Sequence, residues 1–169
     1  MDYVVYDGTA AFAPASEIFG VYDAVFHEGA DLTHWLDSPW GRHLARDGFR
    51  LATARDGRRL TGFAWGYTGG RGQHWSDLVA DSLSQRVADT WLGEHFELVE
   101  LAVLEEFRRR GVGGRLHDVV LDGLPHQRAL LSTTDDEDDP AVRLYRSRGW
   151  VSLGRLTEGV QVLGRRLNA

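Results

Sequence analysis

An apolar strand, a turn rich in arginine and glycine, and an amphipathic helix follow one another in the second half of the chain. His95–Leu104 is rich in apolar residues and predicts a central strand of a sheet. Arg108–Arg115 holds three glycines and four arginines, and apolar residues then recur at helical spacing as far as Leu121. Glycines let a backbone approach a ligand closely, and a helix start exposes unpaired N–H groups that favour anions. Because arginine suits phosphate recognition, this unit predicts a pyrophosphate cradle.

The rest of the chain alternates between strand-like and helix-like segments, which predicts one α/β domain over residues 1–169. Asp56-Gly57 lies between two apolar segments and predicts a hairpin. The four glycines of Gly66–Gly72 predict a flexible loop, which is either a lid, an acceptor wall or a mobile connection. Strands are expected over residues 3–6, 49–54, 60–67, 95–104, 128–133, 150–153 and 160–167. Helices are expected over residues 15–28, 75–91, 111–121 and 141–148, with a short helix and loops over 30–48.

Composition excludes several classes of protein. The 169 residues contain no cysteine, which excludes disulfides, thiolate metal sites and a cysteine nucleophile. All 19 basic residues are arginine, so Schiff-base chemistry and a P-loop are excluded as well. The net charge of −6 argues against a nucleic-acid-binding protein. No targeting signal, membrane span or metal-ligand spacing of histidines is visible, so we expect a cytoplasmic protein without a metal.

A dinucleotide-binding site is a weaker interpretation of the cradle. The dinucleotide fingerprint requires a third glycine at the position of Leu116, and it belongs to an early βαβ unit. Here about 100 residues of other structure precede the turn.

Three segments together resemble the GNAT acetyltransferase superfamily. Arg108, Gly111 and Gly113 have the spacing of its coenzyme A loop, which reads Arg/Gln-x-x-Gly-x-Gly/Ala. Glu100–Val103 is similar to the end of its fourth strand, and Asp139–Trp150 to its Asn-x-x-Ala-x-x-Leu-Tyr-x-x-x-Gly-Phe segment. The resemblance is close over residues 95–154, whereas residues 1–94 match only in their order of elements.

The resemblance implies a mixed, mostly antiparallel sheet of about six to seven strands flanked by about four helices. It also implies a division into a variable substrate half, residues 1–94, and a coenzyme-A-binding half, residues 95–169. The activity implied is an N-acetyltransferase that moves acetyl from acetyl-CoA to a primary amine by direct attack in a ternary complex. The acceptor amine belongs to a small molecule, a protein N-terminus or a lysine, and homodimers are common in the family. The cofactor-binding residues implied are Leu101, Ala102, Val103, Arg108, Arg109, Arg110, Gly111, Val112, Gly113, Gly114 and Asp138.

The same resemblance assigns Tyr145 as the acid that protonates the leaving thiolate, although a core aromatic on a helix is the alternative. Glu97 and Glu100 are the candidate bases, with Glu100 favoured, and water is the third option. Two residues depart from the family pattern: Glu105 stands where a proline is common, and Asp138 stands where an asparagine is usual. A carboxylate cannot donate the hydrogen bond that an amide donates.

Other interpretations stay open at the level of sequence. A non-catalytic acyl-CoA-binding or sensor domain would carry the same cradle. The acidic run of residues 135–139 is either a solvated turn or a mouth that attracts cationic amines. Trp35 and Trp40 are expected in the core or in the lining of a pocket.

Overall fold

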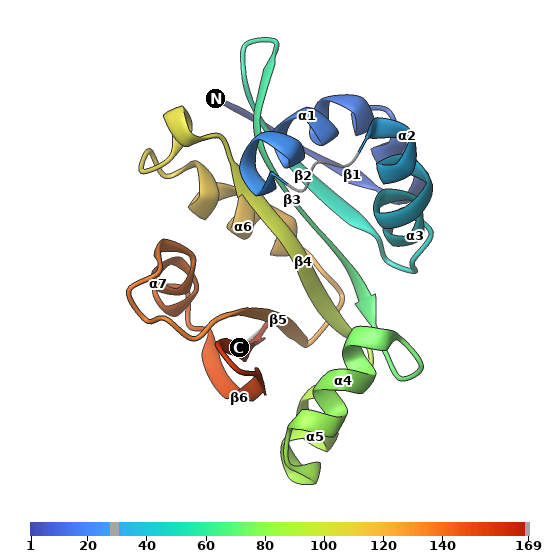
Figure 1. Ribbon diagram of the computed structural model, residues 1–169, viewed down its shortest axis with the longest axis vertical. Coiled ribbons are helices and arrows are strands. Elements are labelled where there is room, and N and C mark those ends of the chain that lie inside the picture. Colours follow the sequence, from blue (N-terminus) through green and yellow to red (C-terminus); the bar gives the residue numbers. More distant parts are fainter. Residues whose placement is uncertain (28–30, 168–169) are drawn as a thin grey trace. The chain divides into compact units, whose positions relative to one another are not determined.

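The computed structural model describes residues 1–27 and 31–167 (Figure 1). Its seven strands form a sheet in the order β1-β2-β3-β4-β5-β7-β6. β4 and β5 pair in parallel, whereas β1–β2, β2–β3, β5–β7 and β6–β7 pair antiparallel. The predicted α/β class and the mostly antiparallel sheet are therefore confirmed. The strands are β1 (Asp2–Asp7), β2 (Arg50–Asp56), β3 (Arg59–Gly69), β4 (His95–Val103), β5 (Arg128–Thr134), β6 (Val151–Thr157) and β7 (Val160–Arg166).

Two predicted helical regions are divided into shorter helices. Residues 75–91 were expected as one helix, but the backbone is extended at Leu83 and Ser84, so that two helices form. The region 30–48 holds two four-residue α-helices joined by a π-helical turn, Leu36–Trp40. The predicted helix over 15–28 ends at Phe26, and Glu28 lies outside the described residues. The helices are α1 (Ala15–Phe26), α2 (Leu32–Trp35), α3 (Gly41–Leu44), α4 (His74–Ser82), α5 (Gln85–Trp91), α6 (Val112–Leu121) and α7 (Pro140–Arg146).

The described chain divides into two compact units that interleave in sequence. Unit 1 comprises Met1–Tyr67 and Val99–Gly123, and unit 2 comprises Thr68–Leu98 and Leu124 onwards. The unit boundaries therefore lie within β3 and β4. They do not coincide with the expected division between residues 94 and 95, which stays a prediction about substrate and cofactor halves.

An aromatic core holds unit 1 together. The short helices α2 and α3 and the turn between them pack with α1 against β2 and β3. Trp35 and Trp40 are fully buried with their rings stacked, 4.9 Å between centroids, and Trp40 meets Trp65 edge to face at 5.1 Å. Such pairs contribute about 0.5–1.5 kcal/mol each beyond the area that they bury. Both tryptophans singled out in the sequence thus lie in the core.

The hairpin between β2 and β3 forms at Asp56-Gly57 as predicted. The first part of the expected loop over Gly66–Gly72 belongs to β3 instead. Gly57 has a φ of 58°, which suits the tight turn. β3 continues through Gly66 to Gly69, and the turn starts only at Gly70. A Cβ on Gly69 would lie 2.3 Å from Nε2 of His95, so this glycine lets the strand pass directly over the histidine ring.

Unit 2 packs α4 against its own strands. Val79 and Leu83 form a buried cluster with Leu130 of β5 and Val162 of β7. His95 at the start of β4 is fully buried in this unit, and neither of its ring nitrogens has a hydrogen-bond partner among the described residues. Burial, together with the charges of Arg128 and His126, lowers the pKa of His95 to about 4.

Gly62 tests the packing of unit 1, because a Cβ there would lie 2.7 Å from the carbonyl oxygen of Ala102. We expect Gly62→Ala to lower the free energy of unfolding by about 1–3 kcal/mol, since β3 or β4 must shift. Gly20→Ala is the matched control, because that helical glycine has open space around it. It should stabilise the protein by about 0.5–1 kcal/mol. Urea denaturation measures both; equal effects would contradict the close packing of β3 on β4.

The lowered pKa of His95 predicts that the protein loses stability in mild acid. Its folded pKa of about 4 lies below the ordinary value of 6.5, so the unfolded chain takes up the proton first. Stability should therefore fall as the pH drops from about 6.5 to about 4, by roughly 3 kcal/mol from this group. His95→Phe should reduce that slope in denaturation curves measured between pH 7.5 and 4.5, and the remaining slope comes from groups such as His43, whose pKa is also lowered to about 4. The exposed His74→Phe should leave the slope intact; the same slope in all three proteins would refute the assignment.

Candidate active site

β4 leads through a short 3-10 helix, Glu105–Phe107, into the glycine turn in unit 1. Ala102 and Val103 are buried at its end, and Leu101 is half-buried. The N–H of Leu104 donates to the carbonyl of Thr61 at 2.9 Å, which ties the end of the strand to β3. The three residues assigned to the cofactor arm therefore lie on a firmly held strand.

Two left-handed residues shape the turn itself. Arg109 has a φ of 59° and Gly111 a φ of 79°. Gly111 is the N-cap of α6, and it offers no side chain to the first N–H groups of the helix. Those groups have no partner within a helix. Gly113 faces Leu101 and Val103 at ordinary contact distance, 3.6 and 3.7 Å for an added Cβ. An uncapped helix start therefore lies beside β4, at the place where the pyrophosphate cradle is predicted.

The arginines of the turn contact the protein in different ways. Nε of Arg108 donates to the carbonyl of Val103 at 2.9 Å, so this side chain fixes the strand end. The guanidinium of Arg110 lies over the ring of Phe107, 5.5 Å from its centroid, and that of Arg115 over Tyr3 at 6.0 Å. The guanidinium groups of Arg108, Arg110 and Arg115 are therefore held by contacts within unit 1.

The two candidate bases differ in exposure. Glu97 is buried at 5% exposure in unit 2, and Glu100 is half-buried in unit 1. Glu97 pairs in register with Leu130 of β5. A regular strand places residues three apart on opposite faces, so at most one of the two can face an acceptor while the strand is regular. The choice between Glu97, Glu100 and water stays open.

Tyr145 lies on α7 in unit 2 and is 8% exposed. Its ring meets Trp150 edge to face at 5.8 Å, and the N–H of Trp150 donates to the Tyr145 carbonyl at 3.2 Å. Asp139 caps α7 through the N–H of Ala141 at 2.7 Å, and Pro140 begins the helix, as the sequence predicts. The tyrosine is therefore held in one position by its helix and its aromatic neighbour.

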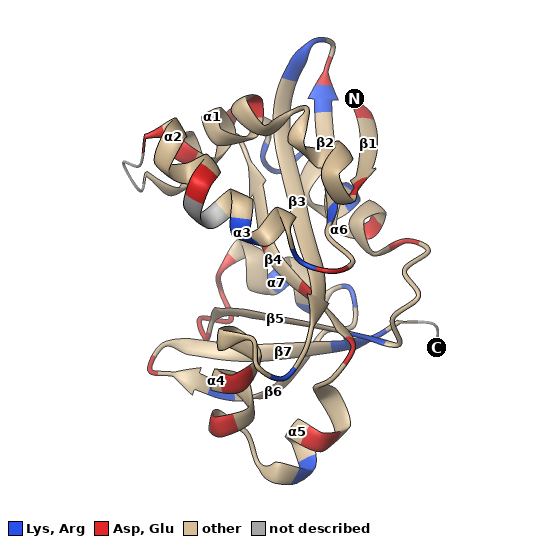
Figure 2. Ribbon diagram, turned by 90° about the vertical axis from the view of Figure 1, so that its right-hand side faces the viewer, with Lys and Arg blue, Asp and Glu red and all other residues tan. Residues whose placement is uncertain are grey.

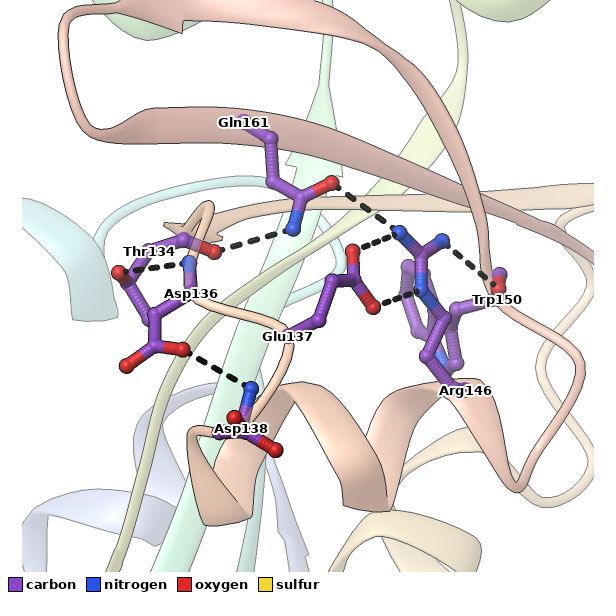
Figure 3. Close-up of polar contacts among 7 residues, drawn as sticks. All are labelled: Thr134, Asp136, Glu137, Asp138, Arg146, Trp150 and Gln161. Carbon is purple, nitrogen blue, oxygen red and sulfur yellow. Dashed lines mark hydrogen bonds and ion pairs between the residues drawn. The ribbon is translucent and has the colours of Figure 1, made fainter.

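The acidic run before α7 is held by ion pairs and hydrogen bonds within unit 2 (Figure 3). Glu137 accepts two hydrogen bonds from Arg146, at 2.6 and 3.2 Å, and this pairing lowers the pKa of Glu137 and raises that of Arg146. Arg146 also donates to Gln161 and to the Trp150 carbonyl. The remaining acids are held by Arg155, a backbone N–H, Arg143 and the start of α7; they are Asp135, Asp136, Asp138 and Asp139.

These ion pairs and hydrogen bonds favour the interpretation of residues 135–139 as a structured turn over their interpretation as an acidic mouth that attracts amines. A carboxylate already paired with arginine has less field left to attract a cationic amine. Asp138 is largely exposed and accepts a hydrogen bond from Arg143, so its assigned contact with the cofactor competes with that pair.

The contacts of His43 and Arg46 with the ring of Tyr67 could not be predicted from the sequence, because these residues meet only through the fold. Across the described residues, no group of three or more His, Cys, Asp or Glu side chains could hold a metal ion. Within the same residues no helix has the length and apolar character needed to traverse a bilayer.

Comparisons with known proteins place the chain among acetyltransferases of one family. The profile of the Acetyltransferase (GNAT) family matches residues 16–150. A GCN5-like protein acetyltransferase of Mycobacterium tuberculosis is 38% identical over 103 residues, which cover 57% of this chain and 50% of that protein. The match thus spans half the length of that relative.

Solved structures share the fold at low sequence identity. An acetyltransferase of Thermus thermophilus superposes with a TM-score of 0.68 at 16% identity, covering 99% of this chain and 98% of that one. The ribosomal-protein-S18-alanine N-acetyltransferase of Escherichia coli gives a TM-score of 0.65 at 12% identity, covering 99% and 96%. These two likenesses show the fold.

The hydrogen bonds from Arg146 to Glu137 predict that this arginine protects the backbone of the acidic run from exchange. Arg146→Gln should speed amide hydrogen exchange severalfold across residues 135–139, because the loop loses its bidentate partner. Arg86→Gln, at an exposed site on α5, serves as the control and should leave this exchange unchanged. Mass spectrometry of peptic fragments measures the rates. Unchanged exchange in the Arg146 variant would show that the loop is held without this arginine.

Proposed function

Because the chain belongs to the GNAT acetyltransferase family, we propose that it transfers an acetyl group from acetyl-CoA to a primary amine. The transfer occurs by direct attack of the amine within a ternary complex. The observation that carries this proposal is the uncapped start of α6, which lies against the end of β4. The names of two similar proteins, a protein acetyltransferase and an alanine N-acetyltransferase, support an amine as acceptor.

The residues at the start of α6 fit the pyrophosphate of coenzyme A. The first N–H groups of the helix lack partners within it, Gly111 provides no cap, and the helix dipole favours negative charge. Arg109 and Arg110 add positive charge on the same turn. The pantetheine arm is assigned to the backbone of Leu101–Val103, whose last carbonyl is fixed by Arg108.

Two proton movements accompany the transfer. The attacking amine must lose a proton, to Glu97, to Glu100 or through water, before its lone pair can form the new bond to the acetyl carbon. The backbone N–H near Val103 polarises the acetyl carbonyl, as an oxyanion-hole donor does. The hydroxyl of Tyr145 donates its proton to the sulfur as the carbon–sulfur bond breaks. The chain has no cysteine to carry the acetyl group, so direct transfer is the simplest course.

Gly111 tests whether the start of α6 binds the cofactor. Gly111→Ala should weaken acetyl-CoA binding at least tenfold in isothermal titration calorimetry, because the left-handed N-cap becomes strained and its N–H groups shift. Gly123→Ala is the matched control, since Gly123 also has a positive φ and open space, at the opposite end of the same helix. Comparable affinity in both variants, or no acetyl-CoA binding by the wild type, would contradict the proposal.

Tyr145→Phe tests the acid. Removing the hydroxyl keeps the ring against Trp150, so we expect a loss in kcat of about 100-fold with little change in acetyl-CoA affinity. Tyr6→Phe on β1 is the control and should retain wild-type kcat. Release of free thiol across a panel of amines measures the rates. A Tyr145 variant with normal kcat removes the tyrosine from the mechanism, and binding without turnover by the wild type would indicate a sensor domain.

A further inference from the structure

Trp75, near the start of α4 in unit 2, reaches two neighbouring strands of the sheet. Its indole N–H donates to Oγ of Ser132 on β5 at 3.1 Å, and its ring centroid lies 6.3 Å from that of His95 on β4. The indole is half-buried and packs against the apolar cluster that contains Leu130. This ring therefore covers a part of the face that β4 and β5 share.

The candidate base Glu97 lies on the covered face. Residues two apart on a strand point to the same side, so Glu97 shares a face with His95, and Leu130 shares one with Ser132. Glu97 and Leu130 are paired in register, which joins the two faces into one. An indole that reaches from His95 to Ser132 therefore lies over the pair of Glu97 and Leu130. The 5% exposure of Glu97 agrees with this cover.

Buried polar atoms near Trp75 can still accept hydrogen bonds. His95 is fully buried, and neither of its ring nitrogens has a hydrogen-bond partner among the described residues. Its pKa of about 4 keeps the ring neutral at pH 7, so one nitrogen is an acceptor. Oε1 of Gln73 and Oγ of Ser76, at the start of α4, are also buried and have no partner among the described residues. The partner that suits these three atoms is a donor.

The border of this face is exposed and acidic. Ser132, the hydrogen-bond partner of the indole, is exposed, so Trp75 stands at the protein surface. The charged side chains of α4, drawn in red in Figure 2, are the exposed acids Asp77 and Asp81. Negative charge at the border of a site attracts a cation.

One arginine opposes this field. The positive charge of Arg128 is among the causes of the lowered pKa of His95. Its guanidinium donates to the carbonyls of Thr90 and Gly93 near the end of α5. The hydrogen bonds of Arg128 are thus made with the backbone, and they leave the acceptor atoms beside Trp75 to another donor.

From this arrangement we propose that Trp75 forms the aromatic wall of the acceptor site, and that the amine of the acceptor is received between its ring and Glu97. A primary ammonium has three N–H donors, and both a carboxylate and the face of an indole attract it. The inference rests on the proposed function for the transfer itself. Within that function it selects Glu97, rather than Glu100, as the group that takes the proton of the amine.

The same residues define the class of acceptor. An apolar or aromatic group next to the amine fits along the ring of Trp75. A carboxylate beside the amine does not fit, because it would meet the like charge of Glu97. The acceptor is therefore an alkyl or arylalkyl primary amine without an adjacent carboxylate.

Three matched probes test this site without turnover. They are 2-phenylethylamine, its neutral isostere 2-phenylethanol, and phenylalanine, which adds a carboxylate beside the amine. In calorimetric titrations of the full chain, we expect 2-phenylethylamine to bind at least tenfold more tightly than either of the others. Glu97→Gln should abolish the preference over the alcohol, whereas Glu158→Gln, at an exposed position after β6, should keep it. Equal binding of amine and alcohol, or a preference that survives in the Glu97 variant, would overturn the proposal.

Variants of Trp75 test the aromatic wall. Trp75→Leu should weaken binding of 2-phenylethylamine about tenfold, whereas Trp75→Phe keeps an aromatic face and should retain most of the affinity. A Leu variant with wild-type affinity would contradict the proposal.

The wild-type protein provides a readout that does not depend on the folding of a variant. The indole N–H signal of Trp75 is identified in NMR spectra as the signal that Trp75→Phe lacks. Titration with 2-phenylethylamine should shift this signal with the midpoint found by calorimetry, and a signal that does not move would overturn the proposal. If the amine binds as expected but acetyl-CoA does not, the proposed function fails and the amine site remains. If acetyl transfer proceeds without the amine preference, only the assignment of Trp75 and Glu97 fails.

Discussion

The left-handed backbone at Arg109 and Gly111 sets the geometry on which the candidate site depends. With these two residues at positive φ, α6 starts immediately beside the strand, and its first N–H groups remain without a side-chain cap. Glycine adopts this conformation without the penalty that a Cβ brings. The approach of β3 to β4 at Gly62 and the bond from Arg108 to the Val103 carbonyl then hold the strand end in place.

Local charge matters more here than the net charge of −6. In unit 2, three of five consecutive acids form ion pairs with Arg143, Arg146 and Arg155, and the other two accept hydrogen bonds from backbone N–H groups, so the negative charge of this segment is partly balanced. In unit 1, the guanidinium of Arg46 lies over Tyr67 with no carboxylate among the described residues paired to it. The field around each segment therefore depends on its partners in the fold as well as on its composition.

The strand–turn–helix unit and the β2–β3 hairpin could be predicted because local signals decide them. Glycine at a left-handed position, Asp-Gly between apolar segments, and apolar residues at helical spacing all act within a few residues. The extension of β3 through Gly69 could not be predicted in this way, since it depends on the ring of His95, which is distant in sequence. The division of residues 75–91 at Ser84 reflects packing of α4 on β5 and β7 in the same manner.

Among the site residues, those on the glycine turn were the most accessible to sequence reasoning. The partners of the acidic run lie up to twenty residues away, and Arg46 reaches Tyr67 only through the fold. Whether Glu97 or Glu100 faces an acceptor likewise depends on strand pairing rather than on the residues themselves.

The most direct test of the account is an NMR titration of the labelled full chain with acetyl-CoA, read at the backbone amides. The account predicts saturable shifts that are largest for Val112, Gly113 and Gly114 at the start of α6, with weaker shifts along Leu101–Val103. Saturable shifts that leave the start of α6 unmoved, or no saturable shifts at all, would contradict the central claim that this uncapped helix start binds the cofactor.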